Sequence, residues 1–161
     1  MSGFFYYICS MNIIFLDIDG VMRTHNSDLN WSRELNQPVP NPFKRLFSKD
    51  AMENLNYLVN LTGSKVVITS TWRMYYTLTE LKNLFRERGF IGHIVDVTNT
   101  GDTRGEEIVQ WLNEHRIDNF VVIDDNIKDI LNRIPDCKVV KCNPLNGLDE
   151  VIFDKALDIL G

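Results

Sequence analysis

The chain lacks the residues from which zinc sites are usually built. Its three cysteines (Cys9, Cys137 and Cys142) form no CxxC pair, and its three histidines are scattered through the sequence. A zinc site is therefore not expected. An odd number of widely spaced cysteines predicts buried or partly buried thiols in a reducing compartment.

Positive charge is also scarce. The formal net charge is −5, whereas tight non-specific binding to a nucleic-acid backbone needs a dense basic face. The fold could still form a local basic site by bringing together some of the scattered basic residues: Lys44, Arg45, Arg73, Arg86, Arg88 and Arg104.

Long hydrophobic runs are missing. The first ten residues are apolar, but they carry no basic segment and are too short for a signal peptide or a membrane span. We therefore expect residues 1–10 to be an extension with little role in the chemistry, and residues 11–161 to form one domain with a single core. A cytoplasmic location follows by default.

Short apolar runs alternate along the chain with segments of helical period. Most of the runs lack polar–apolar alternation, which favours strands buried on both faces of a parallel sheet. The predicted strands are Ile13–Leu16, Val66–Ile68, Ile94–Val97, Phe120–Ile123 and Lys138–Val140. Strand–helix alternation of this kind predicts an α/β fold of three layers with right-handed crossovers.

Five segments place apolar residues on one helical face. Their apolar residues are Met52, Leu55, Leu58 and Val59; Leu78, Leu81, Leu84 and Phe85; Ile108, Trp111 and Leu112; Ile127, Ile130, Leu131 and Ile134; and Leu148, Val151, Ile152 and Ile159. Thr77–Glu80 and Thr103–Glu106 have the sequence of capping boxes, which begin helices. Gly89 predicts a helix stop.

Residues 21–48 interrupt this rhythm. The segment is rich in polar residues and contains Pro38, Pro40 and Pro42, which disfavour regular structure. It predicts a long loop or small flap over the carboxyl end of the first strand. Long loops in compact domains usually serve a site, although a surface excursion without function is the alternative.

Acidic pairs follow two of the predicted strands. Asp17 and Asp19 stand just before Gly20, which permits a tight turn, and Asp124 and Asp125 are adjacent. Ligands bind at the carboxyl ends of strands in open α/β sheets, and adjacent carboxylates at a buried strand end repel each other unless a cation lies between them and other acids. The pairs therefore indicate a metal-bound nucleophile with a proton donor nearby, although aspartates also cap turns and Asp125 could cap a helix.

Two further segments suit an anion. Thr69–Arg73 places three hydroxyls and a guanidinium at a strand end, where they could bind anionic oxygens or cap the next helix. Arg104 falls in the first turn of a predicted helix, where a cation opposes the helix dipole. This unfavourable position indicates that Arg104 and the helix N-terminus face a bound anion; a solvated surface arginine is the alternative.

Acid pair, hydroxyl, basic residue and acid pair follow one another within residues 13–129. This order resembles the four motifs of the haloacid dehalogenase (HAD) superfamily of phosphohydrolases, most specifically at Phe15–Val21 and Val122–Asp125. The resemblance implies a three-layer, Rossmann-like fold. Its five-stranded parallel sheet would have the order 5-4-1-2-3 with helices on both faces, which brings the ends of strands 4, 1 and 2 together.

The resemblance also implies roles for individual residues. Asp17 would be the nucleophile that forms an aspartyl-phosphate, and Asp19 the general acid and base. The substrate phosphate would be bound by Thr69, Ser70, Arg73 and Arg104, with either Thr69 or Ser70 as the phosphate-binding hydroxyl. Mg²⁺ would be bound by Asp17, the backbone carbonyl of Asp19, and Asp125 or Asp124, with Asp129 as a supporting acid.

The family gates its substrates with cap domains inserted after strand 1 or strand 3. Only about 28 residues separate Gly20 from the predicted helix at Asp50, and no space for a second cap exists between residues 98 and 103. No large cap domain is therefore expected, and open sites in this superfamily tend to take large substrates such as nucleic-acid ends or phosphoproteins. The Ser70–Arg73 stretch is similar to capless HAD domains of the Swiss-army-knife type, which are linked to RNA repair.

Aromatic residues near the expected site allow two interpretations. Trp31, Phe43 and Trp72 could stack on a nucleic-acid base, or they could complete the core. His25 is expected to face solvent.

The sequence thus predicts a Mg²⁺-dependent phosphatase that hydrolyses a phosphomonoester, with a nucleotide, a nucleic-acid end or another large molecule as substrate. The alternative is a catalytically idle HAD-like or receiver-like module that binds Mg²⁺ and phosphate. A receiver domain has adjacent acids after its first strand, whereas in this sequence the adjacent pair follows the fourth predicted strand. A Toprim-like nuclease needs a glutamate from an earlier strand, and no suitable earlier strand exists.

Overall fold

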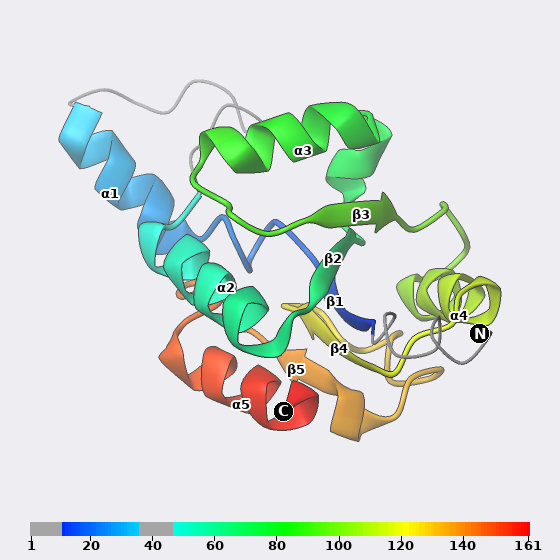
Figure 1. Cartoon of the computed structure of the whole chain (residues 1–161). Helices are drawn as coiled ribbons and strands as arrows, with labels where there is room; N and C mark the ends of the chain where they lie inside the picture. Colours follow the sequence, from blue (N-terminus) through cyan, green and yellow to red (C-terminus); the bar gives the residue numbers. More distant parts are fainter. Residues whose placement is uncertain (1–10, 36–46) are drawn as a thin grey trace, which may run out of the picture.

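A computed structural model describes residues 11–35 and 47–161. They form one sheet of five strands, β1 (Asn12–Leu16), β2 (Lys65–Ile68), β3 (Ile94–Val97), β4 (Asn119–Asp124) and β5 (Val139–Lys141), in the order β3-β2-β1-β4-β5 (Figure 1). All neighbouring strands are parallel. The predicted fold class and strand order are therefore confirmed.

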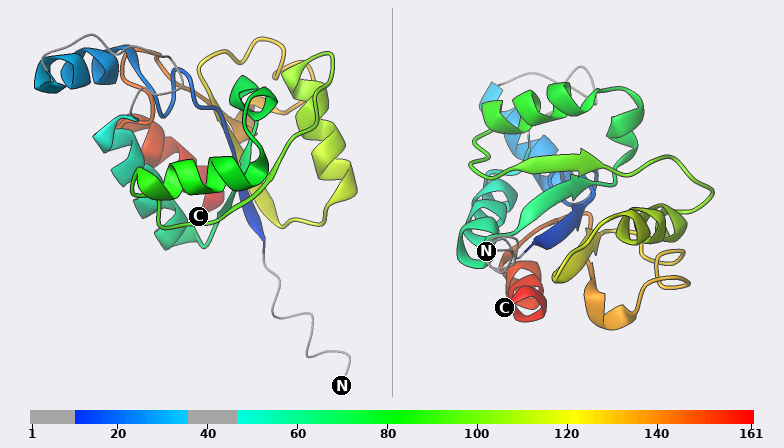
Figure 2. Two further views of the ribbon diagram at one scale, coloured as in Figure 1. Left: turned by 90° about the horizontal axis from the view of Figure 1, so that it is seen from above. Right: turned by 45° about the vertical axis from the view of Figure 1, so that its right-hand side comes forward.

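Helices cover both faces of this sheet. They are α1 (His25–Leu35), α2 (Lys49–Thr62), α3 (Leu78–Glu87), α4 (Arg104–Glu114) and α5 (Glu150–Leu160), with 3-10 turns η3 (Thr71–Met74) and η4 (Asp136–Lys138). Ile14 and Leu16 of β1 join a core formed with α2, α3 and α5, whereas Ile13 and Phe15 join a second core with α4. Figure 2 shows α4 on the opposite side of the sheet from α2 and α5.

The helix signals in the sequence are largely confirmed. Thr77 begins α3 with a complete capping box, and the Thr103 hydroxyl accepts a hydrogen bond from the Glu106 N–H at the start of α4. Gly89 follows the end of α3 with a φ of +94°. Val151 is an exception to the predicted apolar faces, because its side chain is exposed on α5.

Two segments differ from the prediction. Residues 127–134 form turns and no helix, because their hydrogen bonds mix i→i−4 and i→i−3 spacings and Pro135 follows directly. Ile130 and Ile134 are nevertheless buried in the core beneath α4. Residues 25–35, expected in a loop, form α1, which lies at the end of the molecule where the strands finish (Figure 2).

The start of α1 explains why the loop prediction was wrong there. The Thr24 hydroxyl accepts from the Ser27 N–H at 3.0 Å, and the Ser27 hydroxyl accepts from the Thr24 N–H at 2.9 Å. This reciprocal pair of hydrogen bonds acts as a capping box in which serine takes the place of glutamate. Among the described residues, α1 is the sole element between β1 and α2, and no large cap domain is present.

The cysteine prediction holds for Cys142 but not for Cys137, which is exposed. Burial raises the pKa of the Cys142 thiol, so this thiol stays protonated. Cys9, Phe43, Lys44 and Arg45 lie outside the described residues, as does the whole 1–10 extension. Within the described part of the chain, none of the helices has the length and apolar character needed to cross a bilayer.

The loop between β5 and α5 supports the turn that follows β1. The Leu148 N–H donates to the Val21 carbonyl at 2.9 Å, and the His25 N–H donates to the Pro144 carbonyl at 3.2 Å. Gly147 has a φ of +64°, and a Cβ there would lie 2.2 Å from the Val21 oxygen. This close backbone approach supports the turn after β1, which follows the carboxylates of Asp17 and Asp19 directly.

Gly147→Ala and Gly63→Ala form a matched pair that tests this support. Gly63 has nearly the same φ, +66°, but a Cβ there would meet nothing within 4 Å. Gly63→Ala should cost only the left-handed strain of about 1–2 kcal/mol, whereas Gly147→Ala should cost about 1–3 kcal/mol more through overpacking. Denaturant unfolding measures both. Equal losses would show that the Val21 contact relaxes freely.

Candidate active site

Strand register brings residues from three strands to one edge of the sheet. Leu16 of β1 pairs with Ile68 of β2 and with Ile123 of β4. The residues that follow in β1 and β2 continue the pattern, because the Asp17 N–H donates to the Ile123 carbonyl at 3.1 Å and the Thr69 N–H donates to the Leu16 carbonyl at 3.0 Å. Asp17, Thr69 and Asp124 are therefore neighbours, as the strand order predicted.

Three carboxylates converge at this edge. Asp17, Asp124 and Asp125 each offer an oxygen, and these oxygens all lie within 4.8 Å of one another. Asp17 and Asp124 are buried, and Asp125 is partly exposed. Gly20 makes room for this cluster, because a Cβ at its φ of +81° would lie 2.3 Å from the Asp125 Oδ2. The glycine of the DxDG segment thus permits the approach of an acid from another strand.

Among the cations that the structure describes, Arg104 alone is in direct contact with the carboxylates of this cluster. Its Nη1 lies 2.7 Å from Asp124 Oδ2 and 3.3 Å from Asp17 Oδ1. Asp129 accepts a hydrogen bond from the Arg104 backbone N–H at 3.1 Å and so holds the start of α4 against the site. Three carboxylates therefore face one guanidinium, which leaves an excess of negative charge.

The electrostatic consequence appears in the pKa of Asp17. Burial raises the pKa of this carboxyl well above its usual range, and Asp124 adds to the shift, while Arg104 opposes it. Burial likewise raises the pKa of Asp125, with a further contribution from Asp124. Both carboxyls resist ionisation unless a further positive charge approaches.

The three hydroxyls after β2 are in different environments. The Thr69 Oγ1 is fully buried without a hydrogen-bond partner, whereas the Ser70 Oγ accepts from the Trp72 N–H and caps η3. Thr71 lines the cavity beside the cluster. An unpaired buried hydroxyl costs roughly 1–3 kcal/mol, so Thr69 is the hydroxyl with an unmet bonding capacity next to Asp17.

Arg73 is engaged within the protein. Its guanidinium donates to the backbone carbonyls of Thr69 and Ser70 and to Glu107 Oε2, which lies 2.6 Å away, and both side chains of this ion pair are 6% exposed. The other Glu107 oxygen accepts from the Gly101 N–H at 2.9 Å. The Arg73–Glu107 pair thus joins the end of β2, α4 and the loop before α4.

Asp19 lies at the margin of the cluster, and its side chain is 48% exposed. It accepts hydrogen bonds from Arg23 and from the Trp72 indole. Trp72 is buried, so it does not stack on a base as the sequence allowed. The Trp31 side chain lies outside what the structure describes, and His25 is exposed as expected.

A cavity of about 530 Å³ opens over these groups. Its wall includes Asp17, Asp19, Arg104, Asp124, Asp125 and Asp129, together with residues of the loop before α4. A second cavity of about 340 Å³ shares Asp19 and Asp125 with the first. The carboxylates therefore stand where two open spaces meet.

The donor set fits a hard divalent cation. Mg²⁺ prefers oxygen ligands, usually one or two carboxylates with waters and phosphate, and the cluster supplies three carboxylates with excess negative charge. Both oxygens of Asp124 already accept protein hydrogen bonds, from Arg104 and from the Asn126 N–H. Asp17 and Asp125 are therefore the side chains with more capacity for direct ligation.

Three residues that complete the site have roles that we did not predict from the sequence. Arg23 and Trp72 bind Asp19, and Glu107 binds Arg73. The i,i+4 spacing of Asp19 and Arg23 was a usable signal for an ion pair. Trp72 and Glu107 reach their partners across the fold, so no local spacing predicts them.

Asp17→Asn should stabilise the metal-free protein. Because the folded-state pKa of Asp17 is raised, its contribution to stability is present below the ordinary aspartate pKa and is lost as the pH rises through the folded-state value. At pH 7 the variant should therefore be more stable than the wild type, and this gain should disappear near pH 4. Chelator-treated protein and denaturant unfolding provide the measurement. A less stable variant at pH 7 would show that pairing with Arg104 dominates.

Comparison with known proteins agrees with this geometry. The family model of the HAD domain in Swiss Army Knife RNA repair proteins matches residues 13–152. That range covers the five strands except for Asn12, and it contains the whole carboxylate cluster. No curated protein and no solved structure matches the chain. The chain therefore belongs to the haloacid dehalogenase superfamily, in the family of HAD domains found in Swiss Army Knife RNA repair proteins.

Proposed function

We propose that this protein is a Mg²⁺-dependent phosphatase that hydrolyses a phosphomonoester through an aspartyl-phosphate on Asp17. The observation that carries the proposal is the convergence of Asp17, Asp124 and Asp125, with oxygens within 4.8 Å of one another, in a family of HAD domains. Arg104 contacts the same cluster, and Thr69, whose hydroxyl is unpaired, follows β2 beside the end of β1. Acid, base and anion-binding groups thus occur together.

Asp17 acts as the nucleophile. Its carboxylate oxygen attacks phosphorus, the phosphoryl group moves to Asp17, and the leaving alcohol takes the electron pair of the broken P–O bond. Arg104 and Thr69 bind the phosphoryl oxygens, where charge builds in the transition state. Ser70 and Arg73 hold the turn behind Thr69, because their polar groups are bonded to the protein.

Asp19 serves as general acid and then as general base. In the first step it gives a proton to the leaving oxygen, and in the second it takes a proton from the water that attacks the aspartyl-phosphate. Its place on the walls of both cavities suits a group that must meet the phosphate on one side and the leaving group on the other.

Mg²⁺, held by Asp17, Asp125 and the Asp19 carbonyl with Asp124 in support, would offset the repulsion between the Asp17 carboxylate and the phosphate dianion. Without such a charge, the raised pKa of Asp17 leaves less of the carboxylate form that attacks phosphorus. The protein residues then orient the substrate and transfer its protons.

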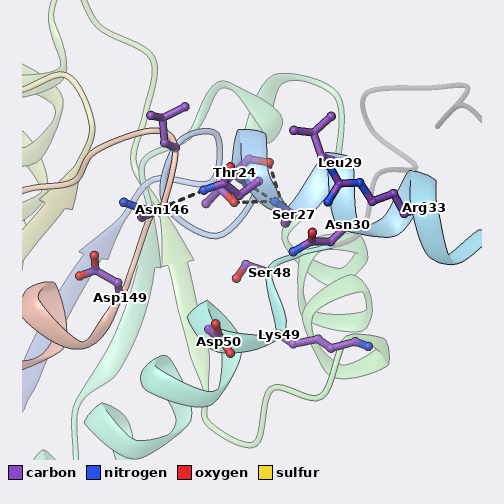
Figure 3. Close-up of a pocket in the computed structure, with 12 residues that line it drawn as sticks. Thr24, Ser27, Leu29, Asn30, Arg33, Ser48, Lys49, Asp50, Asn146 and Asp149 are labelled. Atoms are coloured by element: carbon purple, nitrogen blue, oxygen red, sulfur yellow. Dashed lines mark hydrogen bonds between the residues drawn. The ribbon is translucent and has the colours of Figure 1, made fainter.

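The substrate we favour is a nucleotide or a nucleic-acid end. A third cavity of about 640 Å³ shares Thr24 and Leu145 with the second, so open space continues from Asp19 along α1. Asn30 and Arg33 on α1 and Lys49 on α2 stand on its walls (Figure 3). Amides and cations suit a polar leaving group that extends beyond the phosphate. A cytoplasmic location is part of the same proposal.

A catalytically idle module is the alternative. Such a module would use the same carboxylates and Arg104 to bind Mg²⁺ and phosphate without turnover. Thr69, with its buried and unpaired hydroxyl, serves either function, and hydrolysis distinguishes them.

A substrate screen with Mg²⁺ tests the enzyme proposal. p-Nitrophenyl phosphate, nucleotides, 3′- and 5′-phosphorylated oligonucleotides and phosphopeptides are compared by phosphate release. The wild type should hydrolyse at least one, and Asp17→Asn should lower kcat by about 10³-fold or more. Asp96→Asn serves as the matched control, because Asp96 lies in β3 and accepts a hydrogen bond from the Trp111 indole instead of joining the carboxylate cluster. An Asp17→Asn variant as active as the wild type would overturn the nucleophile assignment.

Arg33→Glu tests the leaving-group side. If the third cavity contacts the substrate beyond its phosphate, this change should lower kcat/KM for a phosphorylated oligonucleotide about tenfold, the effect of losing about 1.4 kcal/mol. Activity on p-nitrophenyl phosphate should be unchanged, because this small ester is too short to reach the side chains of α1. Arg86→Glu makes the same charge change at a different cavity, beside β3. Equal effects of the two variants would mean that only net charge matters.

A further inference from the structure

Trp72 and Arg23 contact one carboxylate from two sides. The Trp72 Nε1 donates to Asp19 Oδ2 at 3.1 Å, and the Arg23 Nη1 donates to Asp19 Oδ1 at 2.7 Å. Trp72 is 1% exposed, so its ring is closed off from any substrate. Each oxygen of Asp19 thus has its own donor, and the two donors come from different parts of the chain.

Both donors are held by their own surroundings. The Trp72 ring packs on Tyr76, with centroids 5.9 Å apart and planes 30° from parallel, and its backbone N–H is bonded to Ser70. Arg23 is held through its backbone, which bonds to Ile18 and Gly20, and through its Nη2, which donates to Asp28 at 3.1 Å. The donors therefore have fixed positions that do not depend on Asp19.

Asp19 needs this support because the rest of its environment is open. Its side chain is 48% exposed and lines two cavities, so little else limits rotation of the carboxyl group. A general acid must lie within hydrogen-bond reach of the leaving oxygen, and a displacement of about 1 Å in a reacting group can cost about 10²-fold in rate.

We propose that Trp72 and Arg23 are positioning residues that orient the Asp19 carboxyl toward the leaving oxygen. The inference rests on the proposed phosphatase function and deepens it. The step concerned is departure of the alcohol: the P–O bond breaks, its electron pair stays on the alcohol oxygen, and the Asp19 proton moves to that oxygen. Asp28 extends the same chain of contacts to α1.

The leaving group provides a readout that a purely structural role would not move. p-Nitrophenolate departs with little help from an acid, whereas an alkyl alcohol needs a proton. Trp72→Phe, which keeps the ring but removes the N–H, should therefore lower kcat/KM for an alkyl phosphate about 10-fold or more. kcat/KM for p-nitrophenyl phosphate should change less than about threefold. Arg23→Lys should show the same pattern, and Asp19→Asn a stronger one.

Trp111→Phe is the matched control. Trp111 is also buried and also donates its indole N–H to an aspartate, Asp96, at 2.8 Å, but it belongs to the core beneath α4. Trp111→Phe should leave the ratio of kcat/KM for the alkyl phosphate to kcat/KM for p-nitrophenyl phosphate unchanged. Unfolding curves for all variants identify any folding defect.

Two outcomes would overturn the positioning role. In one, Trp72→Phe and Arg23→Lys lower kcat/KM equally for the alkyl phosphate and for p-nitrophenyl phosphate. In the other, the two variants change kcat/KM for neither ester. A wild-type protein that releases phosphate from no member of the substrate screen would instead contradict the proposed function itself, so the two failures are distinguishable.

Discussion

The mutual repulsion of buried carboxylates shapes the site and much that surrounds it. Asp17, Asp124 and Asp125 are held together by parallel strand pairing, and only Arg104 among the described cations touches them directly. The sheet thus forces like charges together, at a cost that the hydrophobic cores on its two faces offset. A bound cation is the natural partner of such a cluster, and a phosphate then has a charge to bind.

Around this cluster the protein uses ion pairs as connectors between elements. Arg73 and Glu107 join β2, α4 and the loop before α4, while Arg23 joins the DxDG turn to α1 through Asp28. Both pairs leave the central carboxylates without further neutralisation.

The sequence was sufficient for the fold because its signals were local and repeated. The apolar runs predicted all five strands, and the family resemblance supplied their order. It was insufficient where packing decides the outcome. Residues 127–134 carry a helical pattern but form turns that bury Ile130 and Ile134, and α1 begins at the Thr24–Ser27 pair that the polar composition obscured.

The same distinction applies to the site. Residues that directly follow strands, such as Asp17 and Asp124, could be selected because the carboxyl ends of parallel strands meet at one edge. The contacts of Trp72 and Glu107 could not be predicted, since each acts on a partner more than thirty positions away. Sequence reasoning therefore identified the reacting groups better than the residues that hold them.

The central place of β1 in the sheet has a consequence for synthesis of the protein. β1, which directly precedes Asp17, is the first of the five strands to be synthesised, but its neighbour β4, with Asp124, follows about a hundred residues later. A nascent chain that ends before β4 therefore lacks two of the three clustered acids. The charge repulsion at the site therefore arises only after β4 has been synthesised.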